Sequence, residues 1–229
     1  MKKIGLIGGT GPESTLIYYK KLNEKIYGIT GSFPEMTVES VNLFKALAYC
    51  ENNDLNGLFG YLYSAAENLI ISGCDILALT ANTLHIVFEE LKNAVPVPFI
   101  SITEAAADYA GALGVKKPVL LGTKFTMESD FFGNPFEKRS IRIVTPGKKD
   151  RDFINGKISG ELEAGIISSV TKAEITEIVN RIIGGEGADG VILGCTELPL
   201  LFGAEDFSVP VIDTMEIHIR KLAEAALNG

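Results

Sequence analysis

Cys195 is the residue of this sequence best suited to proton-transfer chemistry on a small carboxylate. It follows the apolar run Gly190–Leu193 and Gly194, and the polar segment Thr196–Pro199 comes directly after it. At a turn from a strand into a helix, the helix dipole and free backbone N–H groups favour a thiolate. We therefore expect Cys195 to have a lowered pKa and to move protons near neutral pH. A lone cysteine is often a small buried core residue, but the polar turn favours the functional interpretation.

Hydroxyl and amide side chains follow other predicted strands in similar places. With free backbone N–H groups at helix starts, such side chains can bind a carboxylate without a cation. Any one of them could simply cap a helix, but their convergence favours a binding role for the set. The candidates are Thr10, Asn82, Thr83, Thr123, Thr126 and Thr196.

The chain has two histidines, and they are far apart in the sequence. A metal site needs several ligands gathered at short spacing, so we expect no metal here. His85 falls one turn into the helix that is predicted after Thr83. There it could act as an acid or base, orient a neighbouring group, or fill the core. His218, in the last predicted helix, is interpreted as structural.

The composition argues against several function classes. The chain has 229 residues and a net charge of −8, and an acidic surface repels phosphate backbones, so we expect no nucleic-acid partner. No apolar run reaches the roughly 18 residues that a membrane span needs. The first apolar stretch, Ile4–Ile7, ends in glycines and Pro12, which predicts a buried strand rather than a signal peptide and a protein of the reducing cytoplasm. Cys50 and Cys74 are then expected to be free, structural thiols.

Short apolar runs alternate with helical patterns along almost the whole chain. The runs do not alternate with polar residues, as is typical of strands buried on both faces of a parallel sheet. One helix is predicted after Asp54 as its N-cap, and another from the capping-box sequence Thr171–Glu174 to Gly184-Gly185. Repeated strand–helix units predict a doubly wound α/β fold. The predicted strands are Lys3–Ile7, Thr37–Asn42, Asp75–Leu79, Val97–Ile100, Pro118–Leu121, Ile141–Val144, Gly190–Leu193 and Val209–Ile212.

Two halves of the chain carry matching motifs in the same order. Gly8-Gly9-Thr10 closes the first strand, and Leu121-Gly122-Thr123 closes a strand 113 residues later. Ala81 and Cys195, after a later strand of each half, lie 114 residues apart. The matching register predicts two pseudo-equivalent halves that face each other, with the site at the carboxyl ends of their strands. We expect one domain over 1–98 plus 209–229 and a second over 99–208, which carries Cys195.

These motifs together resemble the aspartate/glutamate racemase family nearly from end to end. Ala81–His85 is similar to the family's first catalytic motif, Cys-Asn-Thr-x-His, and Gly194–Pro199 is similar to its second. The loops Gly8–Thr15 and Gly122–Met127 and the strand Val209–Thr214 also resemble family segments. Each motif alone is unspecific, but the ordered set is specific.

The resemblance implies two pseudosymmetric, doubly wound parallel-sheet domains with the active site between them, and a cofactor-free amino-acid racemase. In such an enzyme one cysteine removes the α-proton and a second, on the opposite face, returns one. Cys195 would be one of the pair. The amino acid's carboxylate and amino group would be held by Asn82, Thr83, Thr123 and Thr196. Family members are often dimers, so we expect a homodimer.

The chain departs from the family pattern at two places. Ala81 stands where the first catalytic cysteine belongs, and alanine cannot carry a proton. Thr80 lies one residue before Ala81, and a strand turns its side chain to the opposite face. A water beside Asn82 or His85 is therefore the preferred second acid or base. The segment Ser40–Lys45 also lacks the arginine with which family members often bind a side-chain carboxylate, which leaves a preference for aspartate or glutamate open.

Three hypotheses follow, in order of preference. The first is an amino-acid racemase that uses Cys195 and a second, unidentified group. The second is a single-cysteine decarboxylase or lyase, similar to the arylmalonate decarboxylases of the same superfamily, in which loss of CO₂ makes the carbanion and one proton donor is enough. The third is a non-catalytic protein that binds carboxylates.

Overall fold

The structure is a computed structural model that describes residues 1–228, and it contains two parallel β-sheets. The strand order is β2-β1-β3-β4 in the first sheet and β5-β6-β7 in the second. Every strand pair is parallel, and the strands β1, β3, β5 and β6 are buried along their whole length. The α/β class and the parallel sheets predicted from the unbroken apolar runs are thereby confirmed.

The chain divides into two compact units. Unit 1 comprises residues 1–102 and the C-terminal segment from His218 onward, and unit 2 comprises residues 103–217. Sequence analysis grouped 209–229 with the first half, whereas in the structure the strand within that segment, β7, pairs with β6 of unit 2. Each unit has its own apolar core.

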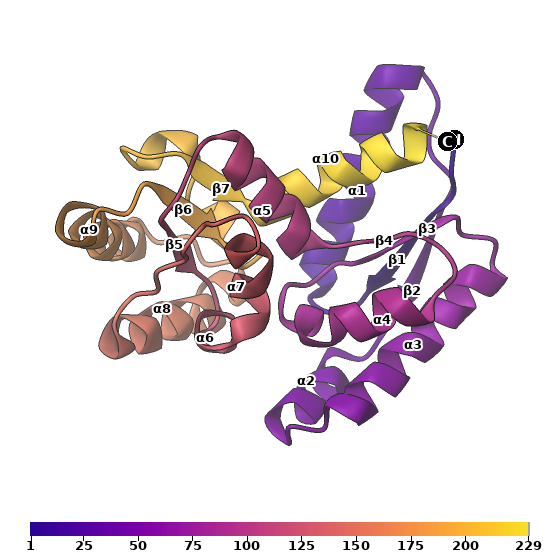
Figure 1. Cartoon of the computed structure of the whole chain (residues 1–229), viewed down its shortest axis with the longest axis horizontal. Coiled ribbons are helices and arrows are strands. Elements are labelled where there is room, and N and C mark those ends of the chain that lie inside the picture. Colours follow the sequence, from indigo (N-terminus) through magenta and orange to yellow (C-terminus); the bar gives the residue numbers. More distant parts are fainter. Residues whose placement is uncertain (229) are drawn as a thin grey trace. The chain divides into compact units, whose positions relative to one another are not determined.

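In unit 1, helices α3 and α4 lie on one side of the sheet, and α1 and α10 lie on the other (Figure 1). Helix α3 begins as predicted, because the Asp54 carboxylate accepts a hydrogen bond from the Gly57 N–H at 2.9 Å. The elements are β1 (Ile4–Gly8), α1 (Pro12–Thr30), β2 (Met36–Ser40), α2 (Leu43–Glu51), α3 (Leu55–Ile71), β3 (Ile76–Leu79), the 3-10 helix η1 (Thr83–Val87), α4 (Phe88–Ala94), β4 (Phe99–Ile100) and α10 (Thr214–Leu227), whose first four residues fall in unit 2.

In unit 2, the strands β5 and β6 lie at the centre of the helices that surround them (Figure 1). The elements are α5 (Ile102–Ala112), which starts at the boundary, β5 (Pro118–Leu121), α6 (Lys124–Glu128), α7 (Asp130–Glu137), α8 (Lys148–Gly160), the 3-10 helix η2 (Leu162–Ala164), α9 (Ser169–Glu186), β6 (Gly190–Leu193), the 3-10 helices η3 (Leu198–Leu200) and η4 (Ala204–Asp206), and β7 (Val211–Asp213).

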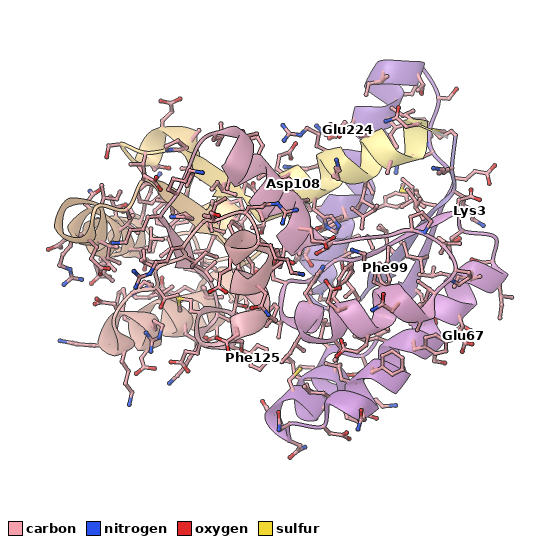
Figure 2. The ribbon with its side chains drawn as sticks, viewed as in Figure 1. Lys3, Glu67, Phe99, Asp108, Phe125 and Glu224 are labelled. Atoms are coloured by element: carbon pink, nitrogen blue, oxygen red, sulfur yellow. The ribbon has the colours of Figure 1, made fainter. Side chains whose placement is uncertain are left out.

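The internal repeat is visible in the hydrogen bonds that join the starts of two neighbouring strands in each unit, β1 and β3 in unit 1 and β5 and β6 in unit 2. Lys3, labelled in Figure 2, donates its N–H to the Asp75 carboxylate at 2.7 Å, across 72 residues. Lys117 donates its N–H to the Asp189 carboxylate at 2.7 Å, also across 72 residues. Both lysine ammonium groups donate to a backbone carbonyl 69 residues further on. The two units therefore repeat the same strand-to-strand contacts at an offset of 114 residues, from Lys3 to Lys117.

Two local predictions were wrong. The segment Ile141–Val144 forms only an isolated bridge, in which Val144 pairs with Val119, so its apolar residues pack beside β5 without extending the sheet. Helix α9 is longer than predicted at both ends. Its N-cap is Ser168, whose hydroxyl accepts the Thr171 N–H, and its C-cap is Gly187 in the left-handed conformation with φ 70°.

Candidate active site

The end of β6 positions Cys195 at a point where two strands approach closely. The Gly194 N–H donates to the Leu121 carbonyl at 2.7 Å, which joins the carboxyl ends of β6 and β5. A Cβ atom on Gly194 would lie 2.9 Å from that carbonyl oxygen and 2.7 Å from the Leu120 side chain. Only glycine fits there without displacing backbone, and the chain then turns to present the thiol of the next residue.

The Cys195 thiol is buried and paired with a carboxylate. Cys195 is 8% exposed, and its Sγ lies 2.8 Å from Oε2 of Glu197. Thr196 donates its hydroxyl to the same oxygen at 2.9 Å. The thiol and the hydroxyl therefore converge on one carboxylate oxygen, and the thiol is the donor of the pair.

The expected lowered pKa of Cys195 was wrong. Burial raises the pKa of the Cys195 thiol well above its ordinary value, and the negative charge of Glu197 and its hydrogen bond raise it further. The charge of Glu163, on η2, acts in the same direction. The backbone N–H effect that sequence analysis relied on is present and lowers the pKa, but it is smaller than the effects of burial and of the Glu197 carboxylate. At neutral pH Cys195 is therefore a thiol, suited to donate a proton.

Glu197 is a residue of the site that sequence reasoning missed as a functional group. Its position two residues after Cys195 in the Gly194–Pro199 motif was the available signal, because a residue that close in a tight turn can fold back onto the thiol. Glu163 had no such signal, since 32 residues separate it from Cys195. Burial and the charge of Glu197 raise the pKa of the Glu163 carboxyl.

The two threonines predicted in the loop after β5 contact each other. Thr123 is the N-cap of α6, and its hydroxyl lies 3.1 Å from that of Thr126. Thr126 is 1% exposed, whereas Thr123 and Thr196 are half-buried. A ligand at this strand end would meet Thr123 first, with Thr126 behind it.

In unit 1, β3 ends at the residues that sequence analysis singled out. Ala81 is half-buried, Asn82 is 5% exposed at the start of η1, and Thr83 is half-buried. Thr80 is fully buried, and its hydroxyl lies 3.3 Å from that of Thr15 and 3.5 Å from that of Thr10. These contacts hold the Thr80 side chain against the loop after β1 and the first turn of α1.

His85 is held at both ring nitrogens. Its Nε2 accepts the Ile102 N–H at 3.2 Å, so its Nδ1 carries the proton and donates to the Ala81 carbonyl at 2.9 Å. Burial lowers the pKa of His85 to about 3, and His218 nearby contributes. A neutral ring with both nitrogens engaged favours the orienting role over the acid/base role.

His218 forms the second half of this buried polar group. Its Nε2 donates to the Ile100 carbonyl at 2.9 Å, and its Nδ1 accepts from the Tyr18 hydroxyl at 2.7 Å. Burial lowers the pKa of His218 to about 4. These bonds connect α10, β4 and α1, in keeping with the predicted structural role.

Within residues 1–228, no group of three or more histidine, cysteine, aspartate or glutamate side chains is arranged to hold a metal ion. All three cysteines are free. A search of the same residues finds no helix that is long and apolar enough to cross a membrane.

Comparison with known proteins gives consistent matches over nearly the full chain. The model of the family described as Asp/Glu/Hydantoin racemase matches residues 7–222. The broad specificity amino-acid racemase RacX of Bacillus subtilis (strain 168) is 26% identical over 219 residues, 92% of this chain and 92% of that protein.

Solved structures match more closely still. A putative Asp/Glu racemase from Yersinia pestis superposes with a TM-score of 0.93 at 34% identity, covering 99% of this chain and 100% of that one. An aspartate racemase homologue from Pyrococcus horikoshii OT3 superposes with a TM-score of 0.88 at 40% identity, with the same coverage.

Proposed function

Because the chain belongs to the Asp/Glu/hydantoin racemase family, we propose that it racemises a free amino acid by proton transfer at the α-carbon, with Cys195 as one of the groups that move the proton. The substrate we propose is aspartate, glutamate or a related amino acid, and the reaction uses no cofactor. The name of RacX as a broad specificity amino-acid racemase and the likeness to an aspartate racemase homologue support an amino-acid substrate.

The contact that carries the mechanism is the bond between Cys195 and Glu197. Racemisation needs one group to remove the α-proton and another to protonate the opposite face. As a thiol, Cys195 can protonate a carbanion. To act as a base it must first release its proton, and the nearest acceptor is Oε2 of Glu197 at 2.8 Å. The thiolate then takes the α-proton, and the electrons of the C–H bond stay on Cα.

We assign substrate binding to the polar side chains at the strand ends of the two units. Backbone N–H groups and hydroxyls there suit a carboxylate. We propose a water molecule as the group that protonates or deprotonates the other face, because Ala81 carries no proton and His85 has both ring nitrogens engaged. The residues assigned to binding are Thr10, Asn82, Thr83, Thr123, Thr126 and Thr196.

The test is proton exchange in D₂O followed by NMR. The purified protein is incubated with each of a panel of L- and D-amino acids, and α-deuterium and enantiomer ratio are measured together. Exchange with inversion supports a racemase, and Cys195→Ser should lower its rate by a factor of about 10³ or more, since general acid–base groups contribute roughly 10²–10⁴. Turnover that survives this substitution would remove Cys195 from the mechanism.

One observation favours a decarboxylase as the second candidate. The thiol keeps its proton at neutral pH, and the equivalent position in the repeat is Ala81. Loss of CO₂ makes a carbanion without a base, so a single protonated thiol is sufficient. If no amino acid exchanges its α-proton, disubstituted malonates should be tested next, with CO₂ release as the readout.

A further inference from the structure

Glu197 has hydrogen-bonding capacity beyond its contact with the thiol. Both bonds that it accepts, from Cys195 and from Thr196, go to Oε2. Among residues 1–228 no donor is bonded to Oε1, and the side chain is half-buried rather than enclosed. A carboxylate has about four acceptor positions, so Oε1 can receive a further donor that arrives from outside the protein.

The charges around this carboxylate select the kind of donor. Glu163 on η2 brings a second negative charge that acts on the Cys195 thiol in the same direction as Glu197, and the charge of Glu197 acts on Glu163. Two carboxylates attract a positively charged ligand group. Every free amino acid brings one such group, its α-ammonium, whatever its side chain is.

We propose that Glu197 binds the α-ammonium group of the substrate through Oε1 while Oε2 keeps its contact with Cys195 and Thr196. This inference rests on the proposed function, because it assigns a role to a group of that site. The ammonium nitrogen is bonded directly to Cα. A single carboxylate that contacts both the ammonium and the thiol therefore sets the distance between Sγ and the α-proton, and such positioning is a main source of rate.

The assignment also predicts which ligands the site rejects. A 2-hydroxy acid has the same carboxylate but no positive charge, so it gains nothing from the two glutamates. We expect the protein to prefer an amino acid to its hydroxy analogue, and we expect Glu197 to account for that preference. The side chain of the substrate is not involved, so the preference should hold across amino acids.

The test measures binding of L-aspartate and L-malate by calorimetry, to the intact protein and to Glu197→Gln. The substitution keeps the shape of the side chain and removes its charge. Affinity for L-aspartate should fall by a factor of ten or more, and affinity for L-malate should change less than twofold. Circular dichroism melting checks that the variant is folded. An unchanged ratio of the two affinities in the folded variant would overturn the proposal.

A second readout reports on the thiol without ligand or turnover. The rate of Cys195 alkylation by iodoacetamide, followed against pH, should shift to lower pH in Glu197→Gln, because the adjacent negative charge is lost. Glu163→Gln should also shift this profile, by less, but leave the aspartate-to-malate ratio unchanged. Glu205→Gln, an exposed carboxylate on η4, should change neither. If Glu163→Gln lowers the ratio as much as Glu197→Gln does, general charge rather than contact with Oε1 explains the preference, and the proposal is wrong.

The Glu197 proposal and the proposed function can fail separately. If L-aspartate binding depends on Glu197 but no α-proton exchanges, the ammonium site is supported and the racemase activity is rejected. Racemisation that continues in Glu197→Gln with an unchanged KM would keep the racemase but reject both the ammonium site and Glu197 as the acceptor of the thiol proton. In Glu197→Asp, which retains the charge but withdraws the oxygens, kcat should fall more than KM rises.

Discussion

Ala81 and Cys195 occupy equivalent places in the repeat, 114 residues apart, but only one of them can carry a proton. Cys195 has a carboxylate partner two residues further on, and Ala81 is followed by Asn82 and Thr83, which have no ionisable group. At the level of single residues, the two strand ends have therefore diverged. One carries a thiol beside a carboxylate, and the other carries only polar groups without an ionisable side chain.

Ala81→Cys tests this divergence directly. If the strand end of β3 still suits a proton-transfer group, the added thiol should raise the rate of racemisation at least tenfold in the enantiomer-ratio assay. Ala81→Ser is the matched control, since its hydroxyl has similar size but a much higher pKa, and it should give no gain. The same rate in all three proteins would show that the group opposite Cys195 does not act from this position.

The buried histidines predict how stability depends on pH. Their pKa values, about 3 for His85 and about 4 for His218, lie below the unfolded value near 6.5. Between those limits the unfolded chain binds more protons, so stability is complete above pH 6.5 and decreases as the pH falls. Each histidine contributes a slope of up to about 1.4 kcal/mol per pH unit.

Urea unfolding at pH 7, 6, 5 and 4.5 measures this slope. His218→Gln can keep bonds to the Ile100 carbonyl and the Tyr18 hydroxyl but cannot titrate, so its free energy of unfolding should fall less steeply between pH 6.5 and 4.5. A variant with the same slope as the unchanged protein would show that His218 is not buried and neutral. Carboxylates titrate in both proteins, so their contribution cancels in the comparison.

At the level of elements, α9 shows how one helix end depends on a single side chain. Ser168 accepts the Thr171 N–H at 3.3 Å and satisfies one of the unpaired donors of the first turn. Thr171 itself is buried inside the helix, and its hydroxyl donates to Glu161. Sequence analysis placed the start at Thr171 because Thr171–Glu174 has the form of a capping box, whereas in the structure Thr171 is buried within the helix and Ser168 is the cap.

Ser168→Ala should therefore lower the free energy of unfolding by about 1 kcal/mol, the usual cost of losing an N-cap. Ser169→Ala is the matched control, because Ser169 is the next residue, exposed and already helical. Its effect should be within about 0.5 kcal/mol of zero, as for other surface changes. Equal losses in the two variants would contradict the assignment of Ser168 as the cap.

At the level of the whole molecule, the repeat predicts equivalent consequences for equivalent residues. Asp75 accepts the Lys3 N–H, and Asp189 accepts the N–H groups of Lys116 and Lys117. Each carboxylate ties together the starts of two neighbouring strands of its own unit. Cooperative units of a protein open locally, each with its own free energy. Loss of one of these carboxylates should therefore lower hydrogen-exchange protection first in the unit that contains it.

Amide hydrogen exchange can test this. Asp75→Ala should lower protection in β1 and β3 by about 1.5–3 kcal/mol of opening free energy, the typical range for a hydrogen bond to a charged group. Asp189→Ala should do the same in β5 and β6. Asp54→Ala, which removes only the cap of α3, serves as a local control. Equal loss of protection in both units from either aspartate substitution would show that the chain opens as one unit.

What the sequence determined by itself is the part of the fold that depends on local pattern. Unbroken apolar runs located the seven strands, and their order in the chain predicted parallel sheets, because buried strands and their crossovers leave a direct mark in composition and spacing. The offset between Ala81 and Cys195 revealed the repeat, and the polar turn after Leu193 identified the thiol.

The tertiary structure decided the states of the groups at those positions. Cys195 keeps its proton because burial and the folded-back Glu197 outweigh the backbone, and His85 is neutral because packing encloses it. Ile141–Val144 has the pattern of a strand, yet only Val144 is bridged to β5. Ionisation depends on dielectric and on distances of a few ångströms between side chains. Strand pairing depends on which neighbours are within reach. Neither is set by the order of residues along the chain alone.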